Sequence, residues 1–518
     1  MPRPDRSNAL DHIVVVMFEN RSFDNLLGRL YQPEEIQTFE GVTGKALVNP
    51  IPEWAQQSGQ SLVPYGIAAT MNTPSPDPGE EYQHVNTQLF GRIDPASNRG
   101  VLAAHMTAPF NAPADPRQRP TMDGFVTDYI SAFAAEMGKE PTYDEYAQIM
   151  TGYTPEQLPV SSTLARGFTT FDHWFCEVPS QTFANRSFFH AGTSSGFVDN
   201  LSPVDSFPVG NDAETIFDRL DQAGLSWRVY CDPHSHISIT GIIHARRLWP
   251  HFATRFFTTE QFLADAASGN LPAYSFIEPN LLIGHNDMHP AFDALFPGAE
   301  IDAPSSLLGG EAMLAGIYNA IRGSSASRGS NAWNTMLLVT FDEHGGTYDH
   351  VPPPLVPPPT SSSTPGQCGF GFDRSGVRVP AIAISPWVPD RTVVTAQYRH
   401  TSMLTTLRRR WSLGDPLTAR DAVAADIAPL LTLDSPRDPA SWPEVAARPV
   451  PPFDPRTPPA GVAMRGLAKA ALLATLALCR HRGKDAPELT KEDEIEHADG
   501  VALVGTVLGD AFPRLHGG

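Results

Sequence analysis

Short hydrophobic runs alternate along the chain with segments in which hydrophobic residues recur every three or four positions. Such runs are typical of buried strands, and the spaced segments are typical of amphipathic helices. The predicted strands are 13–18, 227–230, 273–277, 336–341 and 379–384, and the predicted helices are 183–190, 213–222, 311–321 and 401–411. This alternation predicts an α/β protein with a mostly parallel central sheet flanked by helices.

Polar side chains follow two of the predicted strands directly. Glu19 and Asn20 come after 13–18, and Asp342 and Glu343 come after 336–341 and precede a His and two glycines. Ligands of open α/β sheets bind at the carboxyl ends of the strands. Carboxylate and amide oxygens suit a hard divalent cation, so we predict Mg²⁺, Mn²⁺ or Ca²⁺ here, with Zn²⁺ as the less favoured alternative. The simpler interpretation is that these residues only begin the helices that follow.

A hydroxyl group lies between these two segments in the sequence. Thr182 follows a turn at Pro179 and precedes the predicted helix 183–190, which puts it at a helix N-terminus, where backbone N–H groups hold anions. A threonine becomes an effective nucleophile only when a metal ion or a base takes up its proton. Alone, Thr182 is more typical of a helix cap. The two strands that end in carboxylates favour the interpretation of Thr182 as a nucleophile, because they could supply the metal ion that activates it.

The segments 19–24, 179–186, 342–346 and 348–352 resemble the bacterial phospholipase C and acid phosphatase phosphoesterase family, whose fold is related to the alkaline phosphatase superfamily. The resemblance covers roughly residues 10–412. It implies a metal site formed by Glu19, Asn20, Asp342, Glu343 and Thr182. It also implies that Thr182 attacks phosphorus and becomes a phosphothreonine, with Ser180 as the competing hydroxyl because some members use serine.

The same resemblance implies roles for five further residues. Asp287 and His289 match an Asp-x-His-Pro element that faces the phosphate. His289 or His84 would carry the proton for the leaving group. Asn185 and His400 would bind substrate, although a core or capping role explains His400 equally well.

The resemblance implies a metal-dependent hydrolase of phosphoric esters. A phospholipase C acting on phosphatidylcholine-like diesters is narrowly preferred to an acid phosphatase acting on monoesters. The loops 41–61 and 361–369 hold few of the cations that the extra charge of a monoester requires. A non-catalytic Ca²⁺-binding protein is the more distant alternative. A sulfatase is disfavoured because the sequence has no Cys/Ser-x-Pro-x-Arg run.

Charge and hydropathy narrow the range of partners. The net charge of −20 argues against nucleic acid and against anionic membranes, because both attract Lys and Arg. No hydrophobic run reaches the length of a transmembrane helix. The N-terminal residues lack the hydrophobic region of a signal peptide. We therefore predict a cytoplasmic protein, or a secreted or periplasmic one if a leader precedes this sequence.

The composition changes after Gly414 to a sequence rich in Pro and Ala. We predict a catalytic domain over 1–414 and a C-terminal extension over 415–518. Leucines among alanines at 464–479 predict a helix in the extension. Packing on the catalytic domain is the favoured role for this helix, with a dimer interface or a lipid contact as alternatives.

Overall fold

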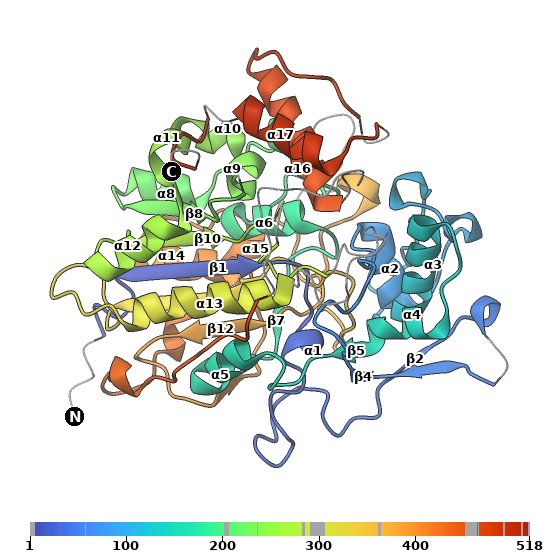
Figure 1. Ribbon diagram of the computed structural model, residues 1–518, viewed down its shortest axis with the longest axis horizontal. Helices are drawn as coiled ribbons and strands as arrows, with labels where there is room; N and C mark the ends of the chain where they lie inside the picture. Colours follow the sequence, from blue (N-terminus) through green and yellow to red (C-terminus); the bar gives the residue numbers. More distant parts are fainter. Residues whose placement is uncertain are drawn as a thin grey trace.

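The computed structural model describes residues 6–515 except 57–58, 201–206, 236, 282–284, 291–305, 361–363, 451–463, 465, 491–492 and 509–510. Among these residues an eight-stranded sheet has the order β13-β6-β12-β11-β1-β10-β8-β9 (Figure 1). Its strands are β1 (His12–Phe18), β6 (Thr169–Phe171), β8 (Trp227–Cys231), β9 (Phe256–Thr258), β10 (Tyr274–Glu278), β11 (Thr335–Phe341), β12 (Ala381–Ile384) and β13 (Thr392–Val394). Neighbours are parallel except where β12 pairs with β11 and β6. The predicted mostly parallel sheet is confirmed.

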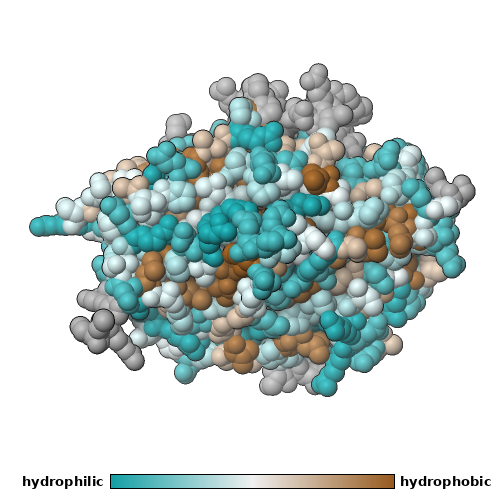
Figure 2. All heavy atoms as spheres, turned by 90° about the horizontal axis from the view of Figure 1, so that it is seen from below, coloured by the Kyte–Doolittle hydropathy of each residue, from teal (hydrophilic) through white to brown (hydrophobic). Residues whose placement is uncertain are grey.

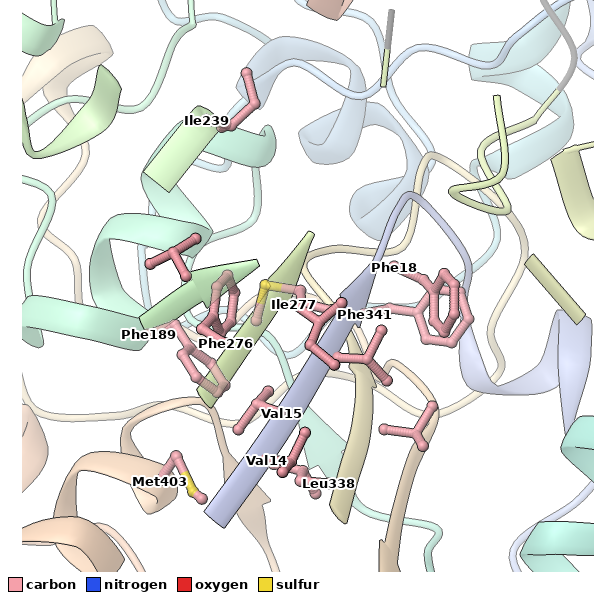
Figure 3. Packing of buried hydrophobic residues seen from close by; sticks show 14 of the residues in the cluster. Val14, Val15, Phe18, Phe189, Ile239, Phe276, Ile277, Leu338, Phe341 and Met403 are labelled. Carbon is pink, nitrogen blue, oxygen red and sulfur yellow. The ribbon is translucent and has the colours of Figure 1, made fainter. Parts of the chain in front are cut away.

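The register of the central strands brings two predicted site segments together. Val15 of β1 lies opposite Phe276 of β10 and Leu338 of β11. These strands are buried along nearly their whole length, as their continuous hydrophobic runs predict for a sheet covered on both faces. Phe18 and Phe341 share a register position, and their ring centroids lie 5.6 Å apart (Figure 3). The residues that follow β1 and β11 therefore emerge at one edge.

Two groups of helices flank the sheet. In Figure 1, α13 passes in front of β1, and it contacts α5 and α12. The second group centres on α6, which contacts α8, α9 and α14 and packs Phe189 against Phe276. The helices of both groups are α5 (Pro159–Gly167), α6 (Thr182–Ala191), α8 (Ile216–Gln222), α9 (Ile239–Ile243), α10 (Ala245–Leu248), α11 (Phe252–Arg255), α12 (Thr259–Ser268), α13 (Ser306–Arg322) and α14 (Thr401–Trp411).

A smaller hydrophobic cluster lies beyond the end toward which β1 points (Figure 1). Its elements are α2 (Tyr82–Phe90), α3 (Phe125–Met137), α4 (Tyr143–Ala147), β2 (Val48–Pro50) and β3 (Leu62–Pro64), and nearby short elements are α1 (Phe23–Leu26), β4 (Gly66–Ile67), β5 (Thr151–Gly152), β7 (Trp174–Phe175) and β14 (Tyr398–Arg399). The loop 41–61 contributes to this region. Residues 57–58 of that loop, and 361–363 of the loop 361–369, lie outside the described part.

The described residues after Gly414 pack on the rest of the chain. They form α15 (Ala419–Ala422), α16 (Gly466–His481) and α17 (His497–Leu508). The predicted helix α16 contacts α9 and α7 (Phe207–Gly210), and Phe512 stacks on Phe252 with ring centroids 4.1 Å apart. The domain boundary at 414 stays a prediction. None of the helices in the described ranges combines the length and hydrophobicity needed to cross a bilayer.

Candidate active site

The loops after β1 and β11 meet at the carboxyl edge of the sheet. Glu19, Asn20, Asp342 and Glu343 are all fully buried there. The Asn20 N–H donates to Asp342 Oδ1 at 3.1 Å, and the Arg21 N–H donates to the Glu343 carbonyl at 3.1 Å. Asn20 has a φ of 57°, a left-handed conformation that asparagine tolerates better than most residues. The two loops thus hold each other in place.

Gly345 allows this close approach. Its φ is 59°, and a Cβ at this position would lie 2.2 Å from the carbonyl oxygen of Asn20. A side chain would therefore push the two loops apart, and only glycine satisfies both the conformation and the space. Gly346 is required by a different contact, because its φ is 64° and a Cβ there would lie 2.5 Å from the carbonyl oxygen of Gly79.

The oxygen atoms at this edge fit a divalent cation. Among the described residues, Asn20 Oδ1, Asp342 Oδ2 and Glu343 Oε1 are buried without a hydrogen-bond partner. An unsatisfied buried polar atom costs about 1–3 kcal/mol, so three together point to a ligand. Burial raises the pKa of Glu19 and of Glu343, because the surrounding protein supplies too little positive charge to keep both ionised. Carboxylate and amide oxygens are the donors that Mg²⁺, Mn²⁺ and Ca²⁺ prefer.

One arginine lies among the carboxylates. Arg186 of α6 is buried and forms an ion pair with Glu19. Its side chain also lies 3.6 Å from Glu278, the last residue of β10, and 3.7 Å from Asp342. Although burial opposes it, these carboxylates raise the pKa of Arg186. The Arg186 guanidinium thus faces carboxylates at the ends of three strands.

Thr182 is the first residue of α6 and reaches this edge. Its hydroxyl is fully buried and donates to Glu19 Oε2 at 3.2 Å. The Ser180 hydroxyl instead donates to the carbonyl of Val198. The structure therefore brings Thr182, and not Ser180, to the predicted metal ligands.

Asn185, which the sequence predicts to bind substrate, forms its hydrogen bonds with backbone groups of the loop before α6. Its Oδ1 accepts from the N–H groups of Glu177 and Val178 at 2.8 and 2.9 Å. Its Nδ2 donates to three carbonyls of the same loop, those of Val178, Ser180 and Gln181. Because its hydrogen-bonding capacity is used within the protein, Asn185 holds the loop that positions Thr182.

Asp287 and His289 lie against the same edge. The Asp287 carbonyl accepts from the Glu19 N–H at 2.8 Å, and its carboxylate accepts from His285 Nδ1 at 2.8 Å and from the His289 N–H at 3.0 Å. His289 Nε2 lies 2.8 Å from Asn20 Nδ2. Burial lowers the pKa of His289 to about 4, so this ring is neutral and accepts the amide proton. Both residues are therefore next to the predicted metal ligands.

Glu80 is a site residue that the sequence reasoning missed. Its carboxylate accepts from Asn20 Nδ2 and, at 3.0 Å, from Gln181 Nε2. Burial raises the pKa of Glu80 to about 8. Asp77, three residues earlier, lies 3.7 Å from His289 Nδ1. The acids around the Pro-Gly turn at 77–81, directly before a helix, are the sequence signal that identifies this segment.

His84 has partners away from the strand ends. Its Nδ1 lies 2.8 Å from Asp128 Oδ1, and its Nε2 lies 4.0 Å from Glu81. Although burial opposes it, Asp128 raises the pKa of His84 to about 9. In the described part of the chain, its contacts tie α2 to α3. The structure thus places Glu80, rather than the predicted His84, against Asn20.

His400 holds the backbone of the loop that follows β11. Its Nε2 donates to the carbonyl of Asp342 at 2.7 Å, and its Nδ1 accepts from Trp174 Nε1 at 3.1 Å. Burial lowers its pKa, which is consistent with a neutral ring in this tautomer. Both nitrogens of His400 thus have protein partners, and the ring fixes the backbone of Asp342. The substrate-binding role of His400 stays a prediction.

Glu177 links the Thr182 loop to the helix that carries His400. Its buried carboxylate accepts from Thr401 N at 2.8 Å, from Thr401 Oγ1 at 2.7 Å and from Arg420 at 2.6 Å. We expect Glu177→Ala to lower the free energy of unfolding by about 3–5 kcal/mol, because it leaves Arg420 buried without its carboxylate. Thermal unfolding would measure this. The exposed Glu488→Ala is the control, and equal unfolding temperatures for the two variants would contradict the expectation.

The fold and the residues at the carboxyl edge of the sheet agree with the family to which the chain belongs. The α/β sheet gathers buried carboxylates and a hydroxyl at the start of a helix at its carboxyl edge, where open α/β sheets bind their ligands. The chain belongs to the Phosphoesterase family, because the model of that family matches residues 10–414. It is therefore a hydrolase acting on phosphoric esters, and the alternative of a non-catalytic Ca²⁺-binding protein is not retained.

Several known proteins are similar to this chain. Non-specific phospholipase C1 of Arabidopsis thaliana is 33% identical over 84% of this chain and 73% of its own length. Phospholipase C B of Mycobacterium tuberculosis is 27% identical over 85% of this chain and 81% of its own length. A solved structure of an alkaline phosphatase superfamily protein from Vibrio parahaemolyticus covers 53% of this chain and 64% of that chain, with 12% identity and a TM-score of 0.32.

Proposed function

We propose that the chain is a metal-dependent phospholipase C that cleaves phosphatidylcholine-like diesters through Thr182. The observation that carries this proposal is the hydrogen bond of the Thr182 hydroxyl to Glu19, at an edge where three buried oxygens lack a hydrogen-bond partner among the described residues. The names of the similar plant and mycobacterial proteins support the same class of substrate.

Glu19, Asn20, Asp342 and Glu343 would hold the cation, with Thr182 beside them. When bound, a divalent ion at this position would neutralise charge on the phosphoryl oxygens and lower the pKa of the Thr182 hydroxyl. The donor atoms are all oxygens, which favours Mg²⁺, Mn²⁺ or Ca²⁺ over Zn²⁺.

The residues of the chain suggest a double displacement. Glu19 Oε2 accepts the proton of Thr182, and Thr182 Oγ1 forms a bond to phosphorus as the bond to the diacylglycerol oxygen breaks. The leaving oxygen needs a proton, and Glu80, whose pKa burial raises to about 8, is the candidate donor. His289, a carrier predicted from the sequence, would first have to take up a proton, because its neutral Nε2 accepts from Asn20. Water then cleaves the phosphothreonine and releases the head-group phosphate. Arg186 holds Glu19 in position during both steps.

The cations near the site favour a diester over a monoester. A phosphate monoester carries a second negative charge near neutral pH, and its binding rewards additional Arg or Lys contacts. Arg186 is engaged by Glu19, Asp342 and Glu278. Arg21 donates to the carbonyls of Met288 and Thr73. Both arginines next to the edge thus already contact protein groups, although Arg21 Nη2 and Arg186 Nε and Nη1 have no hydrogen-bond partner among the described residues, and acid phosphatase activity is the second candidate.

Side-by-side assays of phosphatidylcholine and p-nitrophenyl phosphate test the substrate class. We expect release of phosphocholine from detergent-dispersed phosphatidylcholine at a higher kcat/KM than release of nitrophenol from the monoester. Chelation of divalent ions should abolish both reactions, and Mg²⁺, Mn²⁺ or Ca²⁺ should restore them. A preference for the monoester of roughly a hundredfold, equivalent to about 2.7 kcal/mol of transition-state stabilisation, would replace the phospholipase assignment with an acid phosphatase.

A further inference from the structure

The β2–β3 ribbon has one buried face and one hydrophobic exposed face. The strands pair antiparallel, with Val48 opposite Pro64, Asn49 opposite Val63 and Pro50 opposite Leu62. Asn49 and Val63 face inward and are buried. On the other face, Val48 is 45% exposed and Leu62 is 48% exposed, and Pro64 is exposed beside them. The outer side of the ribbon is therefore hydrophobic where an exposed sheet face usually alternates to polar residues.

The ribbon is rigidly attached to the small hydrophobic cluster. Asn49 Nδ2 donates to the carbonyl of Met122 at 2.9 Å, and its Oδ1 accepts from the N–H of Val126 in α3 at 3.1 Å. Val63 and Ile51 are part of the same buried cluster. Because the inner face is fixed in this way, the outer hydrophobic residues cannot turn inward and remain in solvent.

Two further exposed hydrophobic side chains lie in the short elements that follow β2 and β3 in the sequence. Trp54 lies in a short 3₁₀ turn after β2 and is 41% exposed, and Ile67 of β4 is 55% exposed. Five of the ten large hydrophobic residues that the described chain exposes lie between positions 48 and 102. We call Val48, Trp54, Leu62, Pro64 and Ile67 the ribbon surface. Figure 2 shows hydrophobic side chains at the end of the molecule at which Figure 1 places β2, and others over the middle of the same face.

A pocket continues the ribbon surface through Trp54. Its volume is about 370 Å³, and Arg99, Ser131, Lys139 and Glu140 supply polar groups to its lining. The Arg99 guanidinium lies 4.8 Å from the centroid of the Trp54 ring and forms no ion pair with any residue that the structure describes. Lys139 forms an ion pair with Glu145 at 2.9 Å. This ion pair is exposed to solvent and therefore weak. Two cations and one carboxylate thus border an exposed indole.

The charge around the ribbon is suited to a zwitterionic lipid head group. Between residues 46 and 67 the sequence has a single charged side chain, Glu53, in a chain of net charge −20. Arg99 and Lys139 attract a lipid phosphate, and Glu140 attracts a quaternary ammonium group. A tryptophan at the edge of a hydrophobic patch is typical of side chains that lie at the level of lipid head groups.

The ribbon is connected to both loops of the candidate active site. Tyr65, between β3 and β4, donates its hydroxyl to the carbonyl of Asp24 at 2.7 Å. Its ring also packs on Tyr348, with centroids 5.5 Å apart. Asp24 follows the Glu19–Asn20 segment and Tyr348 follows Asp342–Glu343. A partner bound at the ribbon is therefore held on the side of the molecule where the strands end (Figure 1).

We propose that the ribbon surface and the adjoining Trp54 pocket dock the protein on a phospholipid bilayer with zwitterionic head groups. This inference rests on the proposed phospholipase C function, because an enzyme that cleaves membrane lipids must remain at the bilayer to reach them. The exposed Val48, Leu62 and Ile67 enter the interface between head groups and acyl chains. Arg99 and Lys139 contact the lipid phosphate.

Sedimentation with phosphatidylcholine vesicles tests the docking surface. The variant Trp54→Ala with Leu62→Glu should bind vesicles about tenfold or more weakly, because it removes two hydrophobic contacts and adds a charge. The matched control is Trp333→Ala with Leu263→Glu, since Trp333 is 39% and Leu263 is 41% exposed elsewhere on the surface. Both double variants should cleave a water-soluble choline phosphodiester at the wild-type rate. Equal vesicle binding by the two variants would overturn the proposal.

Two further measurements separate the docking surface from the catalytic proposal. Arg99→Glu should weaken binding to phosphatidylcholine vesicles, and wild-type protein that binds phosphatidylglycerol vesicles more tightly would overturn the choice of a zwitterionic surface. Wild-type protein that binds vesicles with chelated metal, yet never releases phosphocholine, would support docking while contradicting the phospholipase function. Cleavage of dispersed phosphatidylcholine without any vesicle binding would support the phospholipase function and contradict the docking surface.

Discussion

Asp342→Ala should reduce kcat/KM by about a thousandfold or more, the loss expected when a group that stabilises the transition state electrostatically is removed. Asp342 Oδ2 is one of the buried oxygens without a hydrogen-bond partner in the described part of the chain. Asp342 Oδ1 also accepts from the Asn20 backbone, so alanine removes both a ligand and a contact between the two loops. Turnover and bound metal, measured on the same folded preparation, should fall together.

Asp342→Asn separates the charge from the shape of the site. It keeps an oxygen for the Asn20 N–H but removes the negative charge, so we expect the loops to stay in place while the metal is bound more weakly. Glu19→Gln should behave similarly, because Glu19 contacts both Thr182 and Arg186. The exposed Asp415→Ala is the control for a lost carboxylate. A folded Asp342→Ala protein with near wild-type turnover and metal content would contradict the metal assignment.

The sheet was predictable because parallel central strands are buried on both faces. The hydrophobic runs of β1 and β11 are continuous, so each strand and the acids after it could be recognised without knowing their neighbours. The direction of β12 could not be predicted, because a buried run of four residues has no signal for parallel or antiparallel pairing. The parallel register of β1 and β11 then places Glu19 and Asp342 at one edge.

The roles of individual polar residues were harder to predict than their location. Asn185 and His400 do lie near the edge, but their hydrogen bonds are used by the Thr182 loop and by the Asp342 carbonyl. Sequence spacing does not encode such partners: those of Asn185 lie in the irregular loop just before α6, and those of His400 come from distant elements. Glu80 was missed because it lies in an irregular segment before α2, where no periodicity fixes the direction of a side chain.

The comparison of Thr182 with Ser180 is a direct test of the nucleophile. Thr182→Ala should lower kcat by about a thousandfold or more, because it removes the hydroxyl that Glu19 accepts from. Ser180→Ala should have a much smaller effect, since the Ser180 hydroxyl donates to the Val198 carbonyl and only supports the loop. Thr182→Ser should recover much of the activity, because it restores a hydroxyl at the start of α6.

Mass spectrometry of acid-quenched enzyme during turnover should find the head-group phosphate on Thr182, since a covalent ester survives acid while a bound product does not. The label should be absent from Thr182→Ala and present at wild-type levels in Ser180→Ala. Label on Ser180 in the wild-type protein would reverse the assignment, because it would require the loop held by Asn185 to reorganise before reaction. Full activity of Thr182→Ala without any label would instead point to direct attack by water, with Glu19 as the base and Thr182 only as its hydrogen-bond donor.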